Sequence, residues 1–322
     1  MSASGVPTLA IGVPATTSED DLPATLASLY ASAAGGGATA VEVIVGVNGP
    51  EGSAPAVAGV EAFARDHALP FVPPGAAPPP GGSCVRLLRL LPQSKVAAWN
   101  AIREAARAPI IVFADADVRV APAAIPRLVA RLAAAPELAI AAGREAALVT
   151  PEDGLVARIA ALPHRFDFGN VPGRLYALRS AALPEPMPAH VLHEDAYLSV
   201  RLGPERFVKE HEAIVYLRPP TTWHEYLRQR VRNEVGKLQL THEFPELHRA
   251  HGFGRYPWRK FVAEIAPREY PLVALSMAAR LFARVRALRQ IRSGFRRGWA
   301  VLPSTKRWPT ATGASGAGSG RA

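Results

Sequence analysis

The chain has 322 residues, 49% of them hydrophobic, which is enough for one large domain or two small ones with a sizeable core. Its single cysteine, Cys84, excludes an internal disulfide and favours a reducing compartment. The net charge of +10 comes from residues 251–310, where thirteen Lys or Arg stand against two Asp or Glu, so an acidic partner is expected there.

The N-terminal half alternates apolar runs with helical patterns. Strands are predicted over residues 8–14, 41–47, 87–91 and 109–114. Helices are predicted between them, one with Ser18 as its N-cap and others over residues 54–67 and 94–106. The Pro- and Gly-rich stretch 70–83 is expected to be a mobile loop. This alternation indicates an α/β fold with a mostly parallel, doubly wound sheet, which binds ligands at the carboxyl ends of its strands.

The C-terminal half is less regular. Helices are predicted over residues 123–134, 193–202 and 222–240, and strands over 138–143 and 173–178. Residues 270–295 have apolar side chains at helical spacing with arginines between them. The apolar run 271–279 is far shorter than the roughly 20 residues that span a bilayer. The Gly/Ser/Ala-rich tail after Pro303 is expected to be disordered.

Two aspartates, Asp115 and Asp117, follow the apolar strand pattern at 110–114. Side chains at i and i+2 of an extended segment point the same way, so both carboxylates leave the strand end together. Adjacent anions favour a cation between them, and Mg²⁺ or Mn²⁺ typically binds one or two carboxylates plus phosphate oxygens. The pattern therefore predicts a metal–diphosphate site, with a polar turn as the alternative.

Further polar groups surround this pair in order: Lys95–Asn100 (KVAAWN), Gly173–Arg179 (GRLYALR), Glu194-Asp195 and Gln229–Arg232 (QRVR). The acidic pair opens a predicted helix, where a carboxylate suits either proton transfer or the helix dipole. Gln229 and Arg232 are three apart and share a helix face, which is either a binding surface or a solvated one.

In this order and spacing the motifs resemble the inverting family 2 glycosyltransferases of the GT-A fold, a group that includes cellulose, chitin and hyaluronan synthases. The resemblance covers roughly residues 8–240. It implies a hexosyltransferase-type enzyme that moves a sugar from a nucleotide-diphosphate sugar to a hydroxyl with inversion. Mg²⁺ or Mn²⁺ would bind Asp117, with Asp115 beside it or facing the donor. Asp195 would be the general base, supported by Glu194.

The resemblance also implies the remaining site residues. Donor-binding residues are expected at Pro14, Glu19, Asn48, Lys95, Asn100, Asp115, Gln229 and Arg232. Acceptor-side residues are expected at Gly173 and His193. A zinc site at His190, His193 and Glu194 is disfavoured, because His190 precedes the predicted helix and a further ligand is needed.

Three departures from the family pattern limit what is implied. Asn233 stands where the family usually has Trp after QxxR, which weakens the case for a processive polysaccharide synthase. Val47 replaces the usual base-contacting Asp, and Thr17-Ser18-Glu19 stands near the usual Asn-Glu. The choice between uridine and guanosine donors therefore stays open.

The expected domains are a GT-A domain over residues 1–240, a basic helical extension over 241–302 and a disordered tail over 303–322. The basic extension lies on an anionic membrane, binds nucleic acid, or packs on the catalytic domain; no nucleic-acid motif supports the second reading. We expect a cytoplasmic protein without a signal peptide, attached peripherally to the inner face of the plasma membrane. The acceptor is then a lipid-linked or cell-envelope glycan precursor. Alternatives are a soluble transferase for small molecules and an inactive GT-A binding module.

Overall fold

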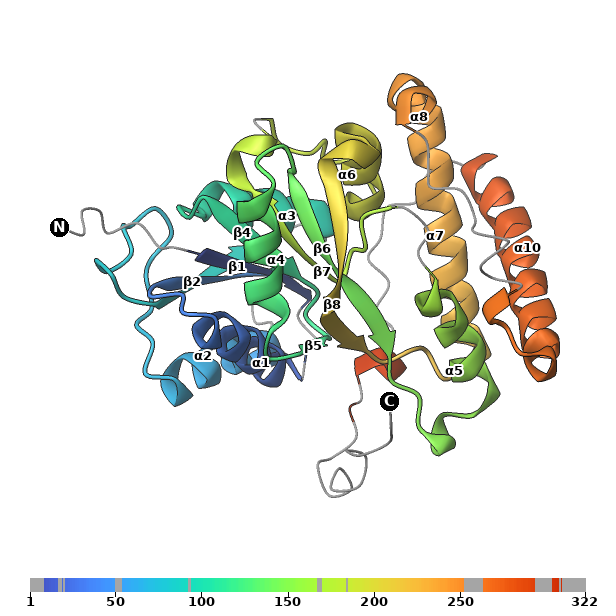
Figure 1. The fold of residues 1–322 in the computed structure, drawn as a ribbon, viewed down its shortest axis with the longest axis horizontal. Helices are drawn as coiled ribbons and strands as arrows, with labels where there is room; N and C mark the ends of the chain where they lie inside the picture. The colour runs from blue at the N-terminus through green and yellow to red at the C-terminus, as the bar shows by residue number, and fades with distance from the viewer. Residues whose placement is uncertain are drawn as a thin grey trace.

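The computed structural model of the chain describes residues 9–16, 19, 21–49, 54–91, 94–166, 170–183, 185–251, 263–292, 303–306 and 308. One eight-stranded sheet, in the order β3-β2-β1-β4-β7-β6-β8-β5, forms its centre (Figure 1). The strands are β1 (Leu9–Thr16), β2 (Val41–Asn48), β3 (Cys84–Leu90), β4 (Ile110–Ala114), β5 (Arg119–Val120), β6 (Ile140–Ala147), β7 (Leu175–Arg179) and β8 (Phe207–Leu217). The helices are α1 (Leu22–Gly35), α2 (Ala54–Asp66), α3 (Lys95–Ala105), α4 (Ala124–Ala134), α5 (Gly154–Ala161), α6 (Glu194–Leu202), α7 (Trp223–Glu243), α8 (Pro245–His251) and α10 (Tyr270–Arg292).

The parallel half of the sheet consists of β3, β2, β1 and β4. Every residue of β1 and β2 is buried, as expected for central parallel strands covered by helices on both faces. The strands predicted at 8–14, 41–47, 87–91 and 109–114 are confirmed as β1 to β4, although β3 begins earlier, at Cys84. The predicted α/β fold with a mostly parallel sheet is likewise confirmed.

The other half of the sheet is mixed, which the sequence pattern did not reveal. β7 runs antiparallel to both β4 and β6, β8 runs parallel to β6, and β5 runs antiparallel to β8. The predicted strands at 138–143 and 173–178 are found as β6 and β7. No strand was predicted at β8, because its middle reads Lys-Glu-His-Glu and shows neither an apolar run nor clean alternation.

Helices cover both faces of the sheet. One core contains Leu22, Leu26 and Leu29 of α1 with side chains of α2 and α4, and the second contains Trp99 of α3 and Leu198 of α6. The helices predicted at 54–67, 94–106, 123–134, 193–202 and 222–240 are confirmed as α2, α3, α4, α6 and α7. Ser18, the predicted N-cap of α1, lies outside the described residues; α1 begins after Asp21, whose side chain makes no capping bond.

A third, smaller core joins the C-terminal helices to the rest of the chain. Ile159 of α5, Tyr226 of α7 and Leu272 of α10 are buried together in it. Figure 1 shows α7 and α10 side by side beyond the edge of the sheet. Within the part of the chain that the structure describes, no helix is long and apolar enough to cross a membrane.

The Pro- and Gly-rich stretch 70–83 is held by one buried ion pair. Arg86 of β3 is paired with Glu42 of β2 at 2.8 Å, and both side chains are almost fully buried. The same guanidinium donates to the carbonyl of Ala76 at 3.0 Å and to that of Pro73. These contacts fasten the middle of a loop that was expected to be mobile.

The start of the predicted disordered tail is ordered. Residues Pro303–Lys306 form a 3₁₀ turn, η6, and Thr305 is buried. The prediction of disorder from Pro303 onward is therefore wrong for this turn, because its side chains find polar partners elsewhere in the chain. The division at residue 240 stays a prediction.

Candidate active site

Asp115 and Asp117 follow the buried end of β4, at the carboxyl edge of the parallel strands. The strand is held rigidly, because Phe113 stacks between Trp99 of α3 and Tyr176 of β7 at centroid distances of 4.8 and 5.6 Å. The indole of Trp99 donates a 2.7 Å hydrogen bond to the hydroxyl of Tyr176. This aromatic layer therefore packs the end of β4 directly before the two aspartates.

Two cationic side chains neutralise the aspartate pair. Lys95, at the start of α3, lies 2.7 Å from Oδ1 of Asp115 and is also paired with Glu194. Arg174, just before β7, bridges the pair, with Nη1 at 2.9 Å from Oδ2 of Asp115 and 3.0 Å from Oδ1 of Asp117. Both oxygens of Asp115 are therefore bound by cations of the protein itself.

This arrangement keeps Asp115 ionised. Burial alone would raise the pKa of Asp115, but the charges of Lys95 and Arg174 outweigh burial and lower it. The converse holds for Lys95, because burial would lower its pKa while Asp115 and Glu194 raise it on balance. Asp115 and Lys95 therefore each stabilise the charged form of the other.

Asp117 is the carboxylate that fits a metal ion. Its Oδ1 is taken by Arg174, whereas its Oδ2 meets only a neutral group, the hydroxyl of Thr305, among the contacts observed, at 3.3 Å. No group of three His, Cys, Asp or Glu side chains able to hold a metal occurs among the described residues. One carboxylate oxygen completed by phosphate oxygens is nevertheless the usual environment of Mg²⁺ in nucleotide sites.

Asp195 lies beside the cluster in the first turn of α6. Its Oδ1 accepts from the backbone N–H of Ala196 at 2.8 Å and lies 3.8 Å from Nδ1 of His193. Burial would raise the pKa of Asp195, but His193 outweighs it and lowers the pKa to about 2. For the neighbouring Glu194, burial is the larger influence and raises its pKa despite Lys95. The two carboxylates of the predicted acidic pair thus have opposite pKa shifts.

Two glycines let the backbone approach Asp195 and His193 closely. A Cβ atom at Gly173 would lie 2.9 Å from Oδ2 of Asp195. A Cβ atom at Gly236 of α7 would lie 2.0 Å from the ring of His193. Both glycines are therefore required by contact with the two residues predicted for base catalysis and the acceptor side.

Arg232 of α7 also lies near the cluster. Burial and the charge of Arg174 lower its pKa, while Asp115, Glu194 and Asp195 act against that shift. The backbone carbonyl of Arg232 lies 3.2 Å from Nε2 of His193, which ties α7 to α6. Gln229, one turn earlier, is half-buried.

The other predicted donor residues are placed less uniformly. Glu19 is buried and accepts a hydrogen bond from the hydroxyl of Thr16 at 2.6 Å. Burial is the main cause of the raised pKa of Glu19, and the nearby charge of Asp117 raises it further. Pro14 and Asn48 lie in the adjoining ends of β1 and β2. Asn100 is directed elsewhere, because its amide makes hydrogen bonds of 2.8 and 2.9 Å to the backbone of Met187.

Sequence reasoning did not single out three residues that the structure brings to this site. Arg174 lies within the GRLYALR segment, of which only Gly173 was predicted as a site residue. Thr305 contacts Asp117, and Lys306 is paired with Glu19 and lies 3.4 Å from the hydroxyl of Thr16. The turn that carries them is anchored by Ser304, which contacts Glu225 of α7.

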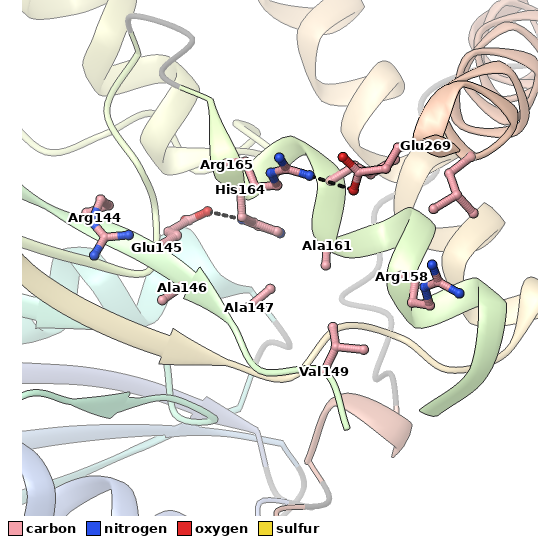
Figure 2. Close-up of a pocket in the computed structure, with 12 residues that line it drawn as sticks. Arg144, Glu145, Ala146, Ala147, Val149, Arg158, Ala161, His164, Arg165 and Glu269 are labelled. Carbon is pink, nitrogen blue, oxygen red and sulfur yellow. Dashed lines mark hydrogen bonds and ion pairs between the residues drawn. The ribbon is translucent and has the colours of Figure 1, made fainter. Parts of the chain in front are cut away.

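A cavity of about 360 Å³ lies between β6, α5 and the start of α10 (Figure 2). Within it Glu145 pairs with Nδ1 of His164 at 2.5 Å, and Arg165 pairs with Glu269 at 2.9 Å. Burial would raise the pKa of Glu145, but His164 lowers it, and Arg174 of the aspartate cluster contributes in the same direction. The charge of Arg174, which bridges the two aspartates, therefore also acts on Glu145 in the cavity wall.

Comparison with known proteins identifies the domain that carries this site. Residues 10–168 match the family model described as Glycosyl transferase family 2. This segment belongs to glycosyltransferase family 2. The family 2 match includes the aspartate pair and Lys95, whereas Asp195 and Arg232 lie beyond it. No curated protein matches the chain.

Solved glycosyltransferase structures resemble the chain at low sequence identity. The mannosyltransferase PcManGT from Pyrobaculum calidifontis, in complex with GDP-Man and Mn²⁺, is 16% identical over 93% of this chain and 77% of that one, with a TM-score of 0.56. TarS 1–349 from S. aureus, in complex with UDP-GlcNAc, is 12% identical over 89% and 92%, with a TM-score of 0.45. The predicted GT-A fold and family are thus confirmed.

Proposed function

We propose that the chain is a metal-dependent, inverting glycosyltransferase that moves a sugar from a nucleotide-diphosphate sugar to a hydroxyl acceptor. The observation that carries this proposal is the convergence of two carboxylates on one charged cluster: Asp117, whose Oδ2 meets no cationic side chain among the described residues, and the ionised Asp195. One group suits a metal-bound leaving diphosphate, and the other suits an attacking hydroxyl.

Residue roles follow from charge and exposure. Asp117 would hold Mg²⁺ or Mn²⁺, which as a Lewis acid stabilises the diphosphate that leaves. Lys95 and Arg174 hold Asp115 in place. Arg232 adds a further positive charge near Asp115. Glu19, Asn48, Pro14 and Gln229 would surround the nucleotide.

Asp195 would take the proton of the acceptor hydroxyl. Its side chain is 28% exposed, more than that of Glu194 at 5%, so an acceptor reaches it more easily. Glu194 is occupied by Lys95 and supports the geometry. Gly173 lets the backbone pack directly against Asp195, which helps to fix the carboxylate, and His193 holds the carboxylate ionised. Direct displacement at the anomeric carbon then inverts its configuration.

The cavity of Figure 2 is our candidate for the acceptor site. It combines the exposed cations Arg144 and Arg158 with the apolar wall of Leu162 and Leu272, which suits a molecule that has both an anionic and an apolar part. A lipid-linked or cell-envelope glycan precursor has this chemistry, and an enzyme acting on it would work at the inner face of the plasma membrane.

A nucleotide-sugar panel tests this function. The purified chain is incubated with UDP- and GDP-sugars and Mg²⁺ or Mn²⁺, and release of nucleoside diphosphate and thermal stabilisation are followed. We expect one donor to be hydrolysed slowly in a metal-dependent way, with the effect lost in Asp117→Asn. Asp195→Asn should still bind that donor without turning it over. A wild-type chain that binds a nucleotide sugar but never releases nucleoside diphosphate, whichever acceptor is added, would instead be an inactive binding module.

A further inference from the structure

Helix α10 carries most of the exposed large apolar side chains among the residues that the structure describes. Twelve such side chains are exposed among the described residues, and seven of them belong to this helix. They are Tyr270, Leu275, Met277, Leu281, Phe282, Val285 and Leu288. Leu281 alone is 67% exposed. Single exposed apolar residues need no explanation, but a row of them on one helix marks an interaction surface.

The face of α10 that packs on the protein is a different one. Ala279, Ala283 and Ala287 are buried in a stripe at helical spacing, and the helix packs there along α7. Leu281, Val285 and Leu288 recur at i, i+4 and i+7, which places them together on the opposite side of the helix. The large side chains of Leu281, Val285 and Leu288 therefore point outward, and the buried face is formed by alanines together with Leu272 at the start of the helix.

The outward face is bordered by positive charge. Helix α10 contains five arginines and no acidic residue. Arg280 and Arg284 extend toward the buried Glu234 of α7, at 3.8 and 3.2 Å. Arg286, Arg289 and Arg292 are exposed. Exposed apolar side chains next to exposed arginines suit contact with an anionic lipid surface.

We propose that the outward face of α10, defined by Leu281, Val285 and Leu288, docks on an anionic lipid surface. The apolar side chains would enter the boundary between headgroups and acyl chains, while Arg286 and Arg289 would reach lipid phosphates. A second copy is a poorer occupant, since a symmetric contact would bring two uncompensated rows of arginines together. Nucleic acid would leave the apolar row in water.

The docked orientation indicates which chemical class of acceptor the enzyme would use, an inference that rests on the proposed function. Leu272, in the first turn of α10, and Glu269 just before it line the cavity of Figure 2. Leu272 lies with the buried stripe, so docking through the opposite face would hold the cavity about 10 Å, one helix diameter, from the lipid surface. An acceptor whose apolar tail remains in the bilayer and whose anionic headgroup enters the cavity fits this placement.

Vesicle flotation of the full chain tests the docking surface. We expect the wild type to float with mixed phosphatidylcholine–phosphatidylglycerol vesicles, to lose binding at high salt and to ignore pure phosphatidylcholine. Leu281→Ser with Val285→Ser should abolish flotation. The matched control is Phe71→Ser with Leu91→Ser, two exposed apolar residues outside α10, which should float as the wild type does.

The charge contribution is tested separately. Arg286→Gln with Arg289→Gln should weaken vesicle binding roughly 25-fold, because each arginine near an anionic surface is worth about fivefold. The matched control removes the same charge elsewhere, with Arg65→Gln on α2 and Arg131→Gln on α4. If both pairs of substitutions weaken vesicle binding equally, net charge alone explains the effect and the proposed role of the outward face of α10 is wrong.

Other outcomes separate the alternatives. Equal binding to neutral and anionic vesicles, or unchanged binding of the Leu281/Val285 variant, contradicts the proposal. A dimer seen by light scattering, dissolved by the same variant and without vesicle binding, shows that a second copy covers the face. A chain that floats as expected but hydrolyses no donor keeps the docking surface and rejects the glycosyl-transfer proposal instead.

Discussion

The two aspartates after β4 differ more than their sequence pattern suggests. Asp115 has a cation on each oxygen, whereas Asp117 shares one oxygen with Arg174 and contacts the Thr305 hydroxyl with the other. The sequence predicted that both would leave the strand on one side, but it gave no means of locating the cations. Asp115 therefore has a structural role, which is to hold Lys95 and Arg174 at the end of β4.

Neutralising each aspartate should separate these roles. Asp115→Asn leaves Lys95 and Arg174, which are 21% and 18% exposed, with less countercharge, so we expect a loss of roughly 1–3 kcal/mol in unfolding free energy. Asp117→Asn should cost less stability and should weaken metal-dependent donor binding at least tenfold. Urea unfolding and donor titration with Mn²⁺ measure the two effects. Similar stability losses in both variants would contradict the distinction.

The low pKa of Asp195 makes it a contributor to acid stability. A carboxyl whose pKa is about 2 in the folded chain and near 4 when unfolded favours the folded state above pH 4, by about 2 kcal/mol. This contribution is lost as the pH falls from about 4 to about 2. We expect Asp195→Asn and His193→Gln each to flatten the pH dependence of the urea midpoint in that range. An unchanged slope in His193→Gln would exclude His193 as the cause.

At the scale of single elements, the sequence predicted most strands and helices of the parallel half. Their apolar runs are long because both faces are buried, which is the condition under which such patterns are most readable. It missed β8, whose charged middle lies in the mixed half of the sheet, and the antiparallel direction of β7. Strand direction depends on contacts between distant segments, and local pattern carries no information on it.

The glycine of α7 that faces His193 provides a test at this scale. Gly236→Ala should favour the helix by propensity but push the His193 ring, because the new Cβ would lie 2.0 Å from it. We expect a folded protein with donor turnover reduced at least tenfold. Gly35→Ala at the end of α1 is the matched control, since nothing lies within 4 Å of its Cβ position. Full turnover in Gly236→Ala would show that α7 does not position the acidic pair.

The ion pair that fastens the 70–83 loop is a second test. Glu42→Ala leaves the guanidinium of Arg86 buried with only carbonyl partners, so we expect a loss of roughly 3–5 kcal/mol in unfolding free energy. The double variant Glu42→Leu, Arg86→Met should recover much of that loss because no charge remains buried. Urea midpoints of the three proteins suffice, and a double variant no better than the single one would contradict this account.

For the molecule as a whole, the sequence located the basic excess correctly but not what the C-terminal residues do. Helix α10 packs through alanines and exposes its large side chains, and the turn after it returns to the strand ends. Helical spacing identifies faces, but it does not say which face is covered. The contact between Lys306 and Thr16 joins residues 290 positions apart, and no local pattern predicts such a pairing.

Removing that lysine should produce a pH-dependent loss of stability. Lys306→Met leaves the buried Glu19 beside Asp117 without its cation, and the folded-state pKa of Glu19, already raised by burial, should rise further. A raised carboxyl pKa favours the folded state at low pH and weakens it as the pH rises through that value. We expect a loss of roughly 3 kcal/mol at pH above 7 that shrinks toward pH 5. A loss independent of pH would contradict this cause.

The return of η6 to the first strand also sets an order of events during synthesis. The last strand of the sheet, β8, ends at Leu217, whereas Thr305 and Lys306 leave the ribosome much later, at about 5–20 residues per second. For several seconds a nascent chain can hold a finished sheet while Glu19 and Asp117 still face water. Until residue 306 emerges, that open, acidic end of the sheet is accessible to chaperones and to free divalent cations alike.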